Sequence, residues 1–229
     1  MSDKGADFVI AATGLRTEAR IAARSAGVRA VAGGGDAARL DQLVRELVAQ
    51  GGEAIVSFGI AAGLAPQRSA GACLIGREVV YRGTACSADP AWTASIKKII
   101  GSADLVRIAG IDRPLTGPSE KEALHQASGA AAADMESHVV ARIAAELALP
   151  FAVLRVIADP AERALPPAAL AGLRMDGGID VGAVVASLAK SPRQLPGLIR
   201  LANEAGRARA TLLRCSDLLG PRLSFRDLS

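Results

Sequence analysis

Carboxylate side chains follow several of the apolar runs in this sequence. Glu18 comes shortly after one run, Asp134 and Glu136 follow another, and Asp159 ends a third. In open sheets of mostly parallel strands, ligands bind beyond the carboxyl ends of the strands, so polar residues matter most there. Three or four carboxylates around one rim would supply hydrogen-bond acceptors and groups for proton transfer. The sequence therefore points to a ligand site with acid–base chemistry.

Each of these residues also has an ordinary structural explanation. Asp134 and Glu136 fit the first turn of a helix, where the helix dipole favours acids. Asp159 precedes a proline, which is a common turn pair. Arg16 and Arg20 lie one helical turn apart, a spacing more typical of an exposed basic edge than of an anion site. The functional interpretation depends on the gathering of these residues at strand ends, and not on any one of them.

Short apolar runs alternate with helix-compatible segments from the start of the chain. Expected strands lie at residues 8–11, 28–32, 53–57, 72–75, 79–82, 105–109, 130–134 and 151–157, the fourth and fifth pairing around Gly76. Expected helices lie at 17–25, 36–50, 135–147, 181–190 and 194–213, and Ser119 and Glu122 resemble a capping box at a further helix start. Strands separated by helices predict a mostly parallel sheet. We expect one α/β domain over residues 1–229, with a central mixed, mostly parallel twisted sheet flanked by helices.

Composition narrows the classes of function. Of the 229 residues, 50% are hydrophobic, 22% are charged and 3% are aromatic, and the formal net charge is +4. This balance is that of a globular protein and not of a disordered chain. Few aromatic rings argue against a nucleic-acid binder that stacks bases, and the positive charge is spread along the chain. No nucleic-acid partner is expected.

Cysteine and histidine positions bear on metals and on location. Cys73, Cys86 and Cys215 form no pair at metal-ligand spacing, and His125 and His138 lack a matching cysteine pattern. We therefore expect neither a metal site nor a cofactor. No apolar run reaches the ~20 residues that span a bilayer, and the first residues lack the pattern of a signal peptide. These features predict a cytoplasmic protein.

Three motifs together resemble those of the nucleoside phosphorylase/nucleosidase superfamily. They are the segment 57–64, the sequence Asp-Met-Glu at 134–136 and the sequence Arg-Val-Ile-Ala-Asp at 155–159, and their order and separations match over roughly residues 7–190. The hopanoid-associated phosphorylase branch shares the Asp-Met-Glu-Ser start, the Leu-Pro-Phe strand entry and the Leu-Pro-Pro loop at 165–167. Members of that branch remove adenine from adenosylhopane. The resemblance implies an enzyme that breaks the N-glycosidic bond of a 5′-substituted adenosine.

The resemblance also implies roles for individual residues. Glu136 would accept hydrogen bonds from the ribose 2′- and 3′-hydroxyls, and its charge would favour an oxocarbenium-like transition state. Met135 would line the sugar. Asp159 would face N7 and the amino group of adenine, and burial must raise its pKa if it is to donate a proton near neutral pH. Further substrate-binding candidates at the strand ends are Gly14, Ala61, Ala62 and Gly63.

The sequence leaves open whether water or phosphate is the nucleophile. Glu18 falls where hydrolytic relatives keep the base that activates water. Ser57 and Ile60 replace an Arg and a Ser of many phosphorolytic relatives, which argues against the usual phosphate site. Arg16 and Arg20 could form a different site for inorganic phosphate as a co-substrate.

Two departures from the family pattern keep other functions open. Ala158 stands where a Ser usually supports the leaving-group Asp, and Pro114 lies near the position of an aromatic ring that usually stacks on the base. One alternative is a nucleosidase for methylthioadenosine or adenosylhomocysteine. Another is a nucleoside-binding protein with impaired catalysis.

The last expected helix suggests a contact with lipid. Arg200, Arg207 and Arg214 recur every seven residues, on roughly one helical face. This basic stripe could rest on anionic headgroups, or it could be the solvated face of a helix that packs on the core. The expected partners are a small-molecule nucleoside, lipid-linked in the hopanoid case, and a membrane surface in peripheral contact. The resemblance also implies a homo-oligomer.

Overall fold

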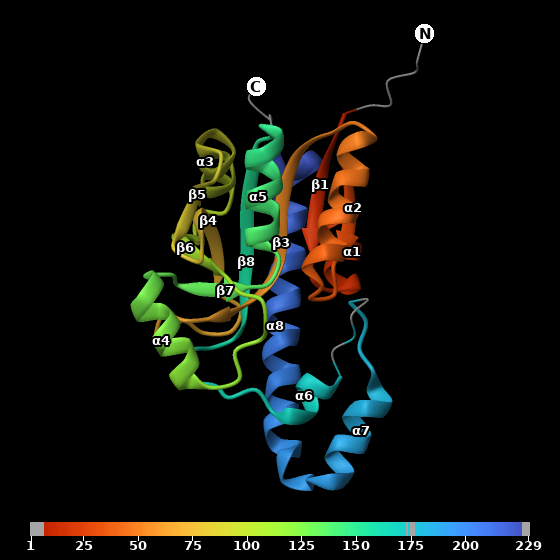
Figure 1. Ribbon diagram of the computed structural model, residues 1–229, viewed down its shortest axis with the longest axis vertical. Coiled ribbons are helices and arrows are strands. Elements are labelled where there is room, and N and C mark those ends of the chain that lie inside the picture. Colours follow the sequence, from red (N-terminus) through yellow and green to blue (C-terminus); the bar gives the residue numbers. More distant parts are fainter. Residues whose placement is uncertain (1–6, 173, 175–176, 226–229) are drawn as a thin grey trace.

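The computed structural model describes residues 7–172, 174 and 177–225 (Figure 1). One sheet within this part of the chain contains the strands β1 (Phe8–Thr13), β2 (Val28–Ala32), β3 (Gly52–Gly63), β4 (Cys73–Tyr81), β5 (Thr84–Ser87), β6 (Asp104–Gly110), β7 (Ala132–Asp134) and β8 (Phe151–Asp159). The helices are α1 (Arg16–Ala22), α2 (Ala37–Ala49), α3 (Pro90–Ile99), α4 (Pro118–Ser128), α5 (Ser137–Leu147), α6 (Pro167–Ala171), α7 (Val181–Lys190), η1 (Pro192–Gln194), α8 (Leu195–Leu219) and η2 (Pro221–Ser224).

The sheet has an open part and a closed part. In the open part, β1 pairs in parallel with both β2 and β3. The long strand β3 pairs with β8 over residues 55–62, and its end, beyond β1, pairs with β7. The pairs β7–β6, β6–β4 and β4–β8 complete a ring of strands. Three pairs are antiparallel, namely β3–β7, β4–β5 and β4–β8. The predicted mixed, mostly parallel sheet flanked by helices is confirmed.

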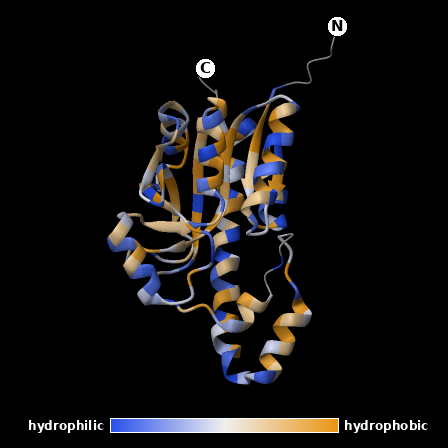
Figure 2. Ribbon diagram, viewed as in Figure 1, coloured by the Kyte–Doolittle hydropathy of each residue, from blue (hydrophilic) through white to orange (hydrophobic). Residues whose placement is uncertain are grey.

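Alternating side chains of the strands supply two hydrophobic cores. Phe8 and Ile10 face α2 and α5, whereas Val9 and Ala11 face α1, α3 and α8. This period of two is that of an extended strand. Because helices cover both faces, every residue of β8 is buried. Figure 2 shows the resulting band of apolar strands between the helices.

The segment around Gly76 differs from the sequence prediction. Residues 72–75 and 79–82 are not two strands paired around Gly76, because β4 runs through it without a turn. A Cβ atom on Gly76 would lie 2.8 Å from Cβ of Val153 and 3.1 Å from Ile108. The glycine therefore allows close approach between strands of the ring, and it is not a turn residue.

The start of α4 also differs. The predicted capping box from Ser119 is wrong, because the helix already begins at Pro118 with Gly117 as its N-cap. Glu120 instead accepts a hydrogen bond from the backbone N–H of Thr116 at 2.7 Å. The side chain of Lys121, on this helix, is fully buried.

The segment from α6 through the first half of α8 extends away from the sheet (Figure 1). α7 has no buried residue. Exposed apolar side chains on and beside it are Ile179, Val181, Val185, Leu195 and Ile199. In the ranges that the structure describes, no helix is long and apolar enough to cross a membrane. The extension is thus a surface with many exposed apolar groups.

Replacing Leu212 by alanine tests how firmly α8 packs on the sheet. Leu212 is fully buried in the core that α8 shares with the strands, so Leu212→Ala should lower the free energy of unfolding by about 2–5 kcal/mol. Leu218, on the same helix, is 63% exposed, and Leu218→Ala should change it by less than about 0.5 kcal/mol. Urea denaturation measures both variants. Equal losses would contradict the packing described.

Candidate active site

A buried guanidinium lies at the centre of the candidate site. Arg155, on β8, has 0% of its surface exposed. Its Nη2 donates to Asp134 Oδ1 at 3.0 Å and lies 3.2 Å from Glu136 Oε2. The same Nη2 donates to Ser57 Oγ, and Nη1 donates to the Ile60 carbonyl at 3.3 Å. Arg155 therefore connects β8 with β3, with the end of β7 and with the residue that precedes α5.

Asp134, the last residue of β7, orients the entry into α5. Its Oδ1 accepts hydrogen bonds from the backbone N–H groups of Glu136 at 2.9 Å and Ser137 at 2.6 Å, and its Oδ2 accepts from Ser137 Oγ at 2.7 Å. The structural explanation of Asp134 as an acid at a helix start is thus correct, but incomplete. Because the same carboxylate pairs with Arg155, it also holds Glu136 beside the guanidinium.

Glu18 is buried in the first turn of α1. Its Oε2 accepts hydrogen bonds from the backbone N–H groups of Gly14 at 3.0 Å and Leu15 at 2.8 Å, and its Oε1 accepts from that of Ile60 at 2.9 Å. These donors favour the ionised carboxylate. Glu18 therefore joins the end of β1 to β3.

Two glycines let these side chains meet. A Cβ atom on Gly14 would lie 2.7 Å from Glu136 Oε1. A Cβ atom on Gly59, where φ is +158°, would lie 2.7 Å from Arg155 Nη1 and 2.9 Å from Glu18 Oε2. Any larger residue at either position would push the charged groups apart. We call Glu18, Asp134, Glu136 and Arg155 the Arg155 cluster.

The Arg155 cluster contains more acids than bases. Burial raises the pKa of Glu136 to about 8; Arg155 opposes this shift, and Asp134 and Glu18 add to it by repulsion. Burial also raises the pKa of Glu18, against the attraction of Arg155 and its three backbone donors. The cluster therefore retains a proton near neutral pH. Such a site attracts a group that develops positive charge and repels an anion.

Asp159 ends β8 and has a partner that the sequence analysis missed. Its Oδ2 lies 2.7 Å from Nζ of Lys121, which is fully buried on α4. The other oxygen, Oδ1, is buried and makes no hydrogen bond within the described residues. Burial raises the pKa of Asp159, and Lys121 counteracts the shift. A raised pKa is what Asp159 requires if it is to donate a proton.

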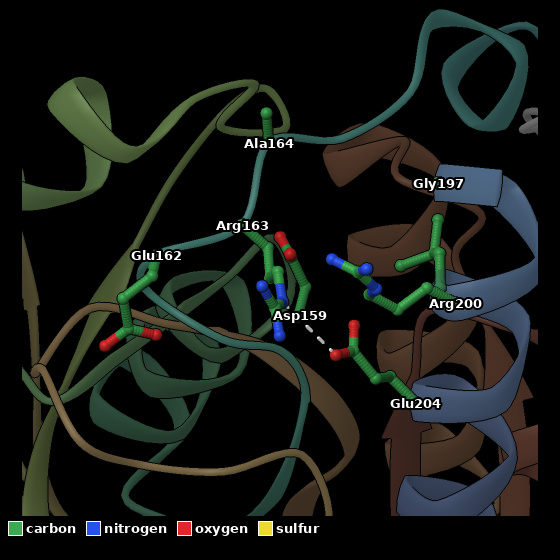
Figure 3. Close-up of a pocket in the computed structure, with 8 residues that line it drawn as sticks. Asp159, Glu162, Arg163, Ala164, Gly197, Arg200 and Glu204 are labelled. Atoms are coloured by element: carbon green, nitrogen blue, oxygen red, sulfur yellow. Dashed lines mark hydrogen bonds and ion pairs between the residues drawn. The ribbon is translucent and has the colours of Figure 1, made fainter. Parts of the chain in front are cut away.

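A cavity of about 200 Å³ opens beside Asp159 (Figure 3). It lies between the segment that follows β8 and the first turns of α8. Its lining residues are Asp159, Glu162, Arg163, Ala164, Gly197, Arg200, Leu201 and Glu204. Arg163 Nε and Glu204 Oε1 form an ion pair of 3.3 Å across it. The lining contains no member of the Arg155 cluster.

The structure brings part of the predicted site together. Gly14, Glu18 and Glu136 meet around Arg155, as the geometry above shows. Asp159 lies farther along the same strand, opposite Ala62 of β3, while Ala61 pairs with Ile157. Gly63 follows in β3 and pairs with β7. The convergence of Glu136 and Asp159 on one nucleoside therefore stays a prediction, because Glu136 contacts β8 through Arg155 whereas Asp159 lies at the end of that strand.

Three other predicted residues lie away from the Arg155 cluster or on the surface. Met135 is half-buried and lines a second cavity of about 300 Å³ with residues that include Gly35 and His138. Arg16 and Arg20 are exposed on α1. Over the part of the chain that the structure covers, no group of His, Cys, Asp and Glu side chains could hold a metal ion.

Replacing Glu136 by glutamine should change how stability depends on pH. A carboxyl group whose pKa rises from 4.5 to about 8 on folding holds a proton that the unfolded chain has released. The free energy of unfolding of the wild type therefore falls as pH rises through this interval. We expect the free energy of unfolding of Glu136→Gln to fall less over this interval. The Tm of the variant should therefore rise relative to that of the wild type between about pH 5 and about pH 9. Parallel Tm curves from thermal unfolding would contradict this assignment.

Known structures share this fold at low sequence identity. The 5′-methylthioadenosine/S-adenosylhomocysteine nucleosidase of Helicobacter pylori superposes with a TM-score of 0.67 at 16% identity, over 93% of this chain and 99% of that chain. Futalosine hydrolase of the same organism superposes with a TM-score of 0.65 at 15% identity, over 92% of this chain and 97% of that chain. The 5′-methylthioadenosine/S-adenosylhomocysteine nucleosidase of Neisseria meningitidis superposes with a TM-score of 0.66 at 14% identity, over 93% of this chain and 98% of that chain.

Sequence comparison identifies the family. No curated protein sequence matches the chain. The family model described as the phosphorylase superfamily matches residues 28–171, which include Asp134, Glu136, Arg155 and Asp159 but not Glu18. The predictions of this superfamily and of an enzyme of its class are confirmed. The chain belongs to the phosphorylase superfamily.

Proposed function

We propose that the protein hydrolyses the N-glycosidic bond of a 5′-substituted adenosine and releases adenine. The observation that carries the proposal is the Arg155 cluster, in which Glu18 and Glu136 both lie buried against Gly14. Family membership and the nucleosidase neighbours support this type of reaction. The predicted substrate is adenosylhopane.

In this proposal, the ribose binds at Glu136. Because the pKa of Glu136 is about 8, its ionised form is the minority near neutral pH; that form only accepts hydrogen bonds, so it suits the two hydroxyls of a ribose diol. As the glycosidic bond breaks, positive charge develops on the sugar. The surplus of buried acids in the Arg155 cluster stabilises that charge more than it stabilises the neutral ground state.

Water is the proposed nucleophile. Its oxygen attacks C1′ while the C1′–N9 bond breaks and the bonding electron pair passes to the purine. Glu18 accepts a proton from the water, and Asp159 donates a proton to N7. Phosphorolysis through Arg16 and Arg20 is the alternative, but a phosphate dianion would have to approach the buried carboxylates of the cluster. Arg155 already has partners in Asp134, Glu136 and Ser57.

The exposed apolar surface near the cavity supports a lipid-linked substrate. Gly197 and Leu201 of α8 line the cavity beside Asp159, and Leu195 and Ile199 on the same helix are 47% and 54% exposed. An apolar 5′-substituent that extends from the ribose to this surface would find apolar side chains to cover it. The exposed Arg200 could contact anionic headgroups from the same helix. Peripheral membrane contact, a cytoplasmic location and a homo-oligomer remain parts of this proposal.

Product analysis with and without inorganic phosphate tests the proposed function. Adenosylhopane, methylthioadenosine and adenosylhomocysteine serve as substrates. We expect adenine and a free sugar without phosphate, with the highest kcat/KM for adenosylhopane. A sugar 1-phosphate that forms only with phosphate would contradict hydrolysis. Release of adenine from none of the three would contradict the function, and a preference for methylthioadenosine would contradict the lipid-linked substrate.

Asp159→Asn tests the role of the leaving-group acid. Asparagine cannot donate the proton, so kcat should fall by about 10²–10⁴-fold. Glu122→Gln is the matched control, because Glu122 is an exposed acid on α4 beside Lys121, and it should keep wild-type turnover. Unchanged turnover in Asp159→Asn would contradict the proposed role, and a wild type that binds nucleoside without turnover would indicate a binding protein.

A further inference from the structure

The environment of Lys121 is unusual for a lysine. The side chain is 0% exposed. Its Nζ donates to Asp159 Oδ2 at 2.7 Å, to the Pro160 carbonyl at 2.8 Å and to the Arg163 carbonyl at 2.9 Å. An ammonium group has three N–H donors, and all three are used here. The contacts therefore match the charged lysine and leave none of its donors unsatisfied.

These three contacts hold one carboxylate and one loop. The carbonyls of Pro160 and Arg163 belong to the segment that follows β8, and this segment forms a wall of the cavity beside Asp159. The preceding residue, Ala158, has a methyl side chain that cannot form a hydrogen bond. Support for the carboxylate of Asp159 thus comes from α4 and not from its own strand.

The two oxygens of Asp159 are used unequally. Oδ2 is bound to Lys121, whereas Oδ1 is buried and has no hydrogen-bond partner within the described residues. A buried oxygen without a partner costs free energy unless a ligand supplies one. The purine N7 or amino group of the proposed substrate is a group of the right kind.

We propose that Lys121 is the positioning residue for the leaving-group acid, a role that rests on the proposed function. It holds Asp159 by one oxygen, leaves the other oxygen for the purine, and fastens the cavity wall through Pro160 and Arg163. Lys121 itself does not contact the substrate. It acts through Asp159.

The charges around Asp159 decide how removal of Lys121 should alter the pH profile. Burial and Glu204 of α8 raise the pKa of Asp159, while Lys121 of α4 and Arg163 of the cavity wall lower it; Glu162 and Arg200 also line the cavity. Without the lysine charge, the pKa of Asp159 rises. Since the acid must be protonated to donate, the alkaline limb of kcat/KM moves to higher pH.

The test compares Lys121→Met with the wild type in adenine release from adenosylhopane and methylthioadenosine. We expect a loss of about tenfold or more at the pH optimum, from misplacement of the acid, and an upward shift of the alkaline limb by about 1–3 pH units. Lys121→Arg, which keeps a cation, should retain the wild-type limb. Lys98→Met is the matched control, because Lys98 is exposed on α3, and it should change neither quantity.

A double-mutant cycle separates a positioning role from a structural one. If Lys121 acts through Asp159, adding Lys121→Met to Asp159→Asn should cause no further loss of kcat/KM. If Lys121→Met does not fold, Lys121→Gln takes its place in both experiments. Losses that multiply, or an unshifted alkaline limb, would overturn the proposal. A wild type that releases no adenine would instead overturn the proposed function.

Discussion

Arg155 is buried without any exposed surface, and a guanidinium in such a place must be surrounded by acceptors. Its two Nη groups find them in Asp134, Glu136, Ser57 and the carbonyl of Ile60, whereas Nε is buried without a hydrogen-bond partner among the described residues. Removal of the guanidinium would leave several acids buried without compensation, which is far costlier than loss of a surface ion pair. The arrangement of β3, β7, β8 and α5 around the site therefore depends on this one side chain.

The same cluster shows a conflict between stability and activity. Burial raises the pKa of Glu136 to about 8. A single guanidinium beside three carboxylates does not cancel this shift. A protein selected for stability alone would replace such an acid by a neutral group. With one proton retained, two ionised carboxylates still face one guanidinium, and this surplus charge becomes useful when a cationic sugar forms beside it, because the site is arranged before the reaction begins. Glycine at positions 14 and 59 is part of this arrangement, since a side chain at position 14 would collide with Glu136 and one at position 59 with Arg155 and Glu18.

Local patterns in the sequence predicted much of the fold and brought part of the candidate site together. Alternation in β1 and the helical spacing of α5 identify buried elements, and the order of carboxylates after strands anticipated the meeting of Glu18 with Glu136. The role of Lys121 was missed, because a lysine between two glutamates at a helix start is typical of a solvated surface. Its burial depends on the segment after β8, which is distant in sequence. Gly76 was misinterpreted as a turn for the same reason, since its close neighbour Val153 belongs to another strand.

In the proposed enzyme, the Arg155 cluster and the Lys121–Asp159 pair serve opposite halves of one nucleoside. The most direct measurement is a crystal structure with an uncleavable 5′-substituted adenosine analogue. We expect the ribose hydroxyls within hydrogen-bond distance of Glu136 and the purine of the same analogue molecule within hydrogen-bond distance of Asp159. An analogue that contacts only one of these two carboxylates, or neither, would contradict this arrangement.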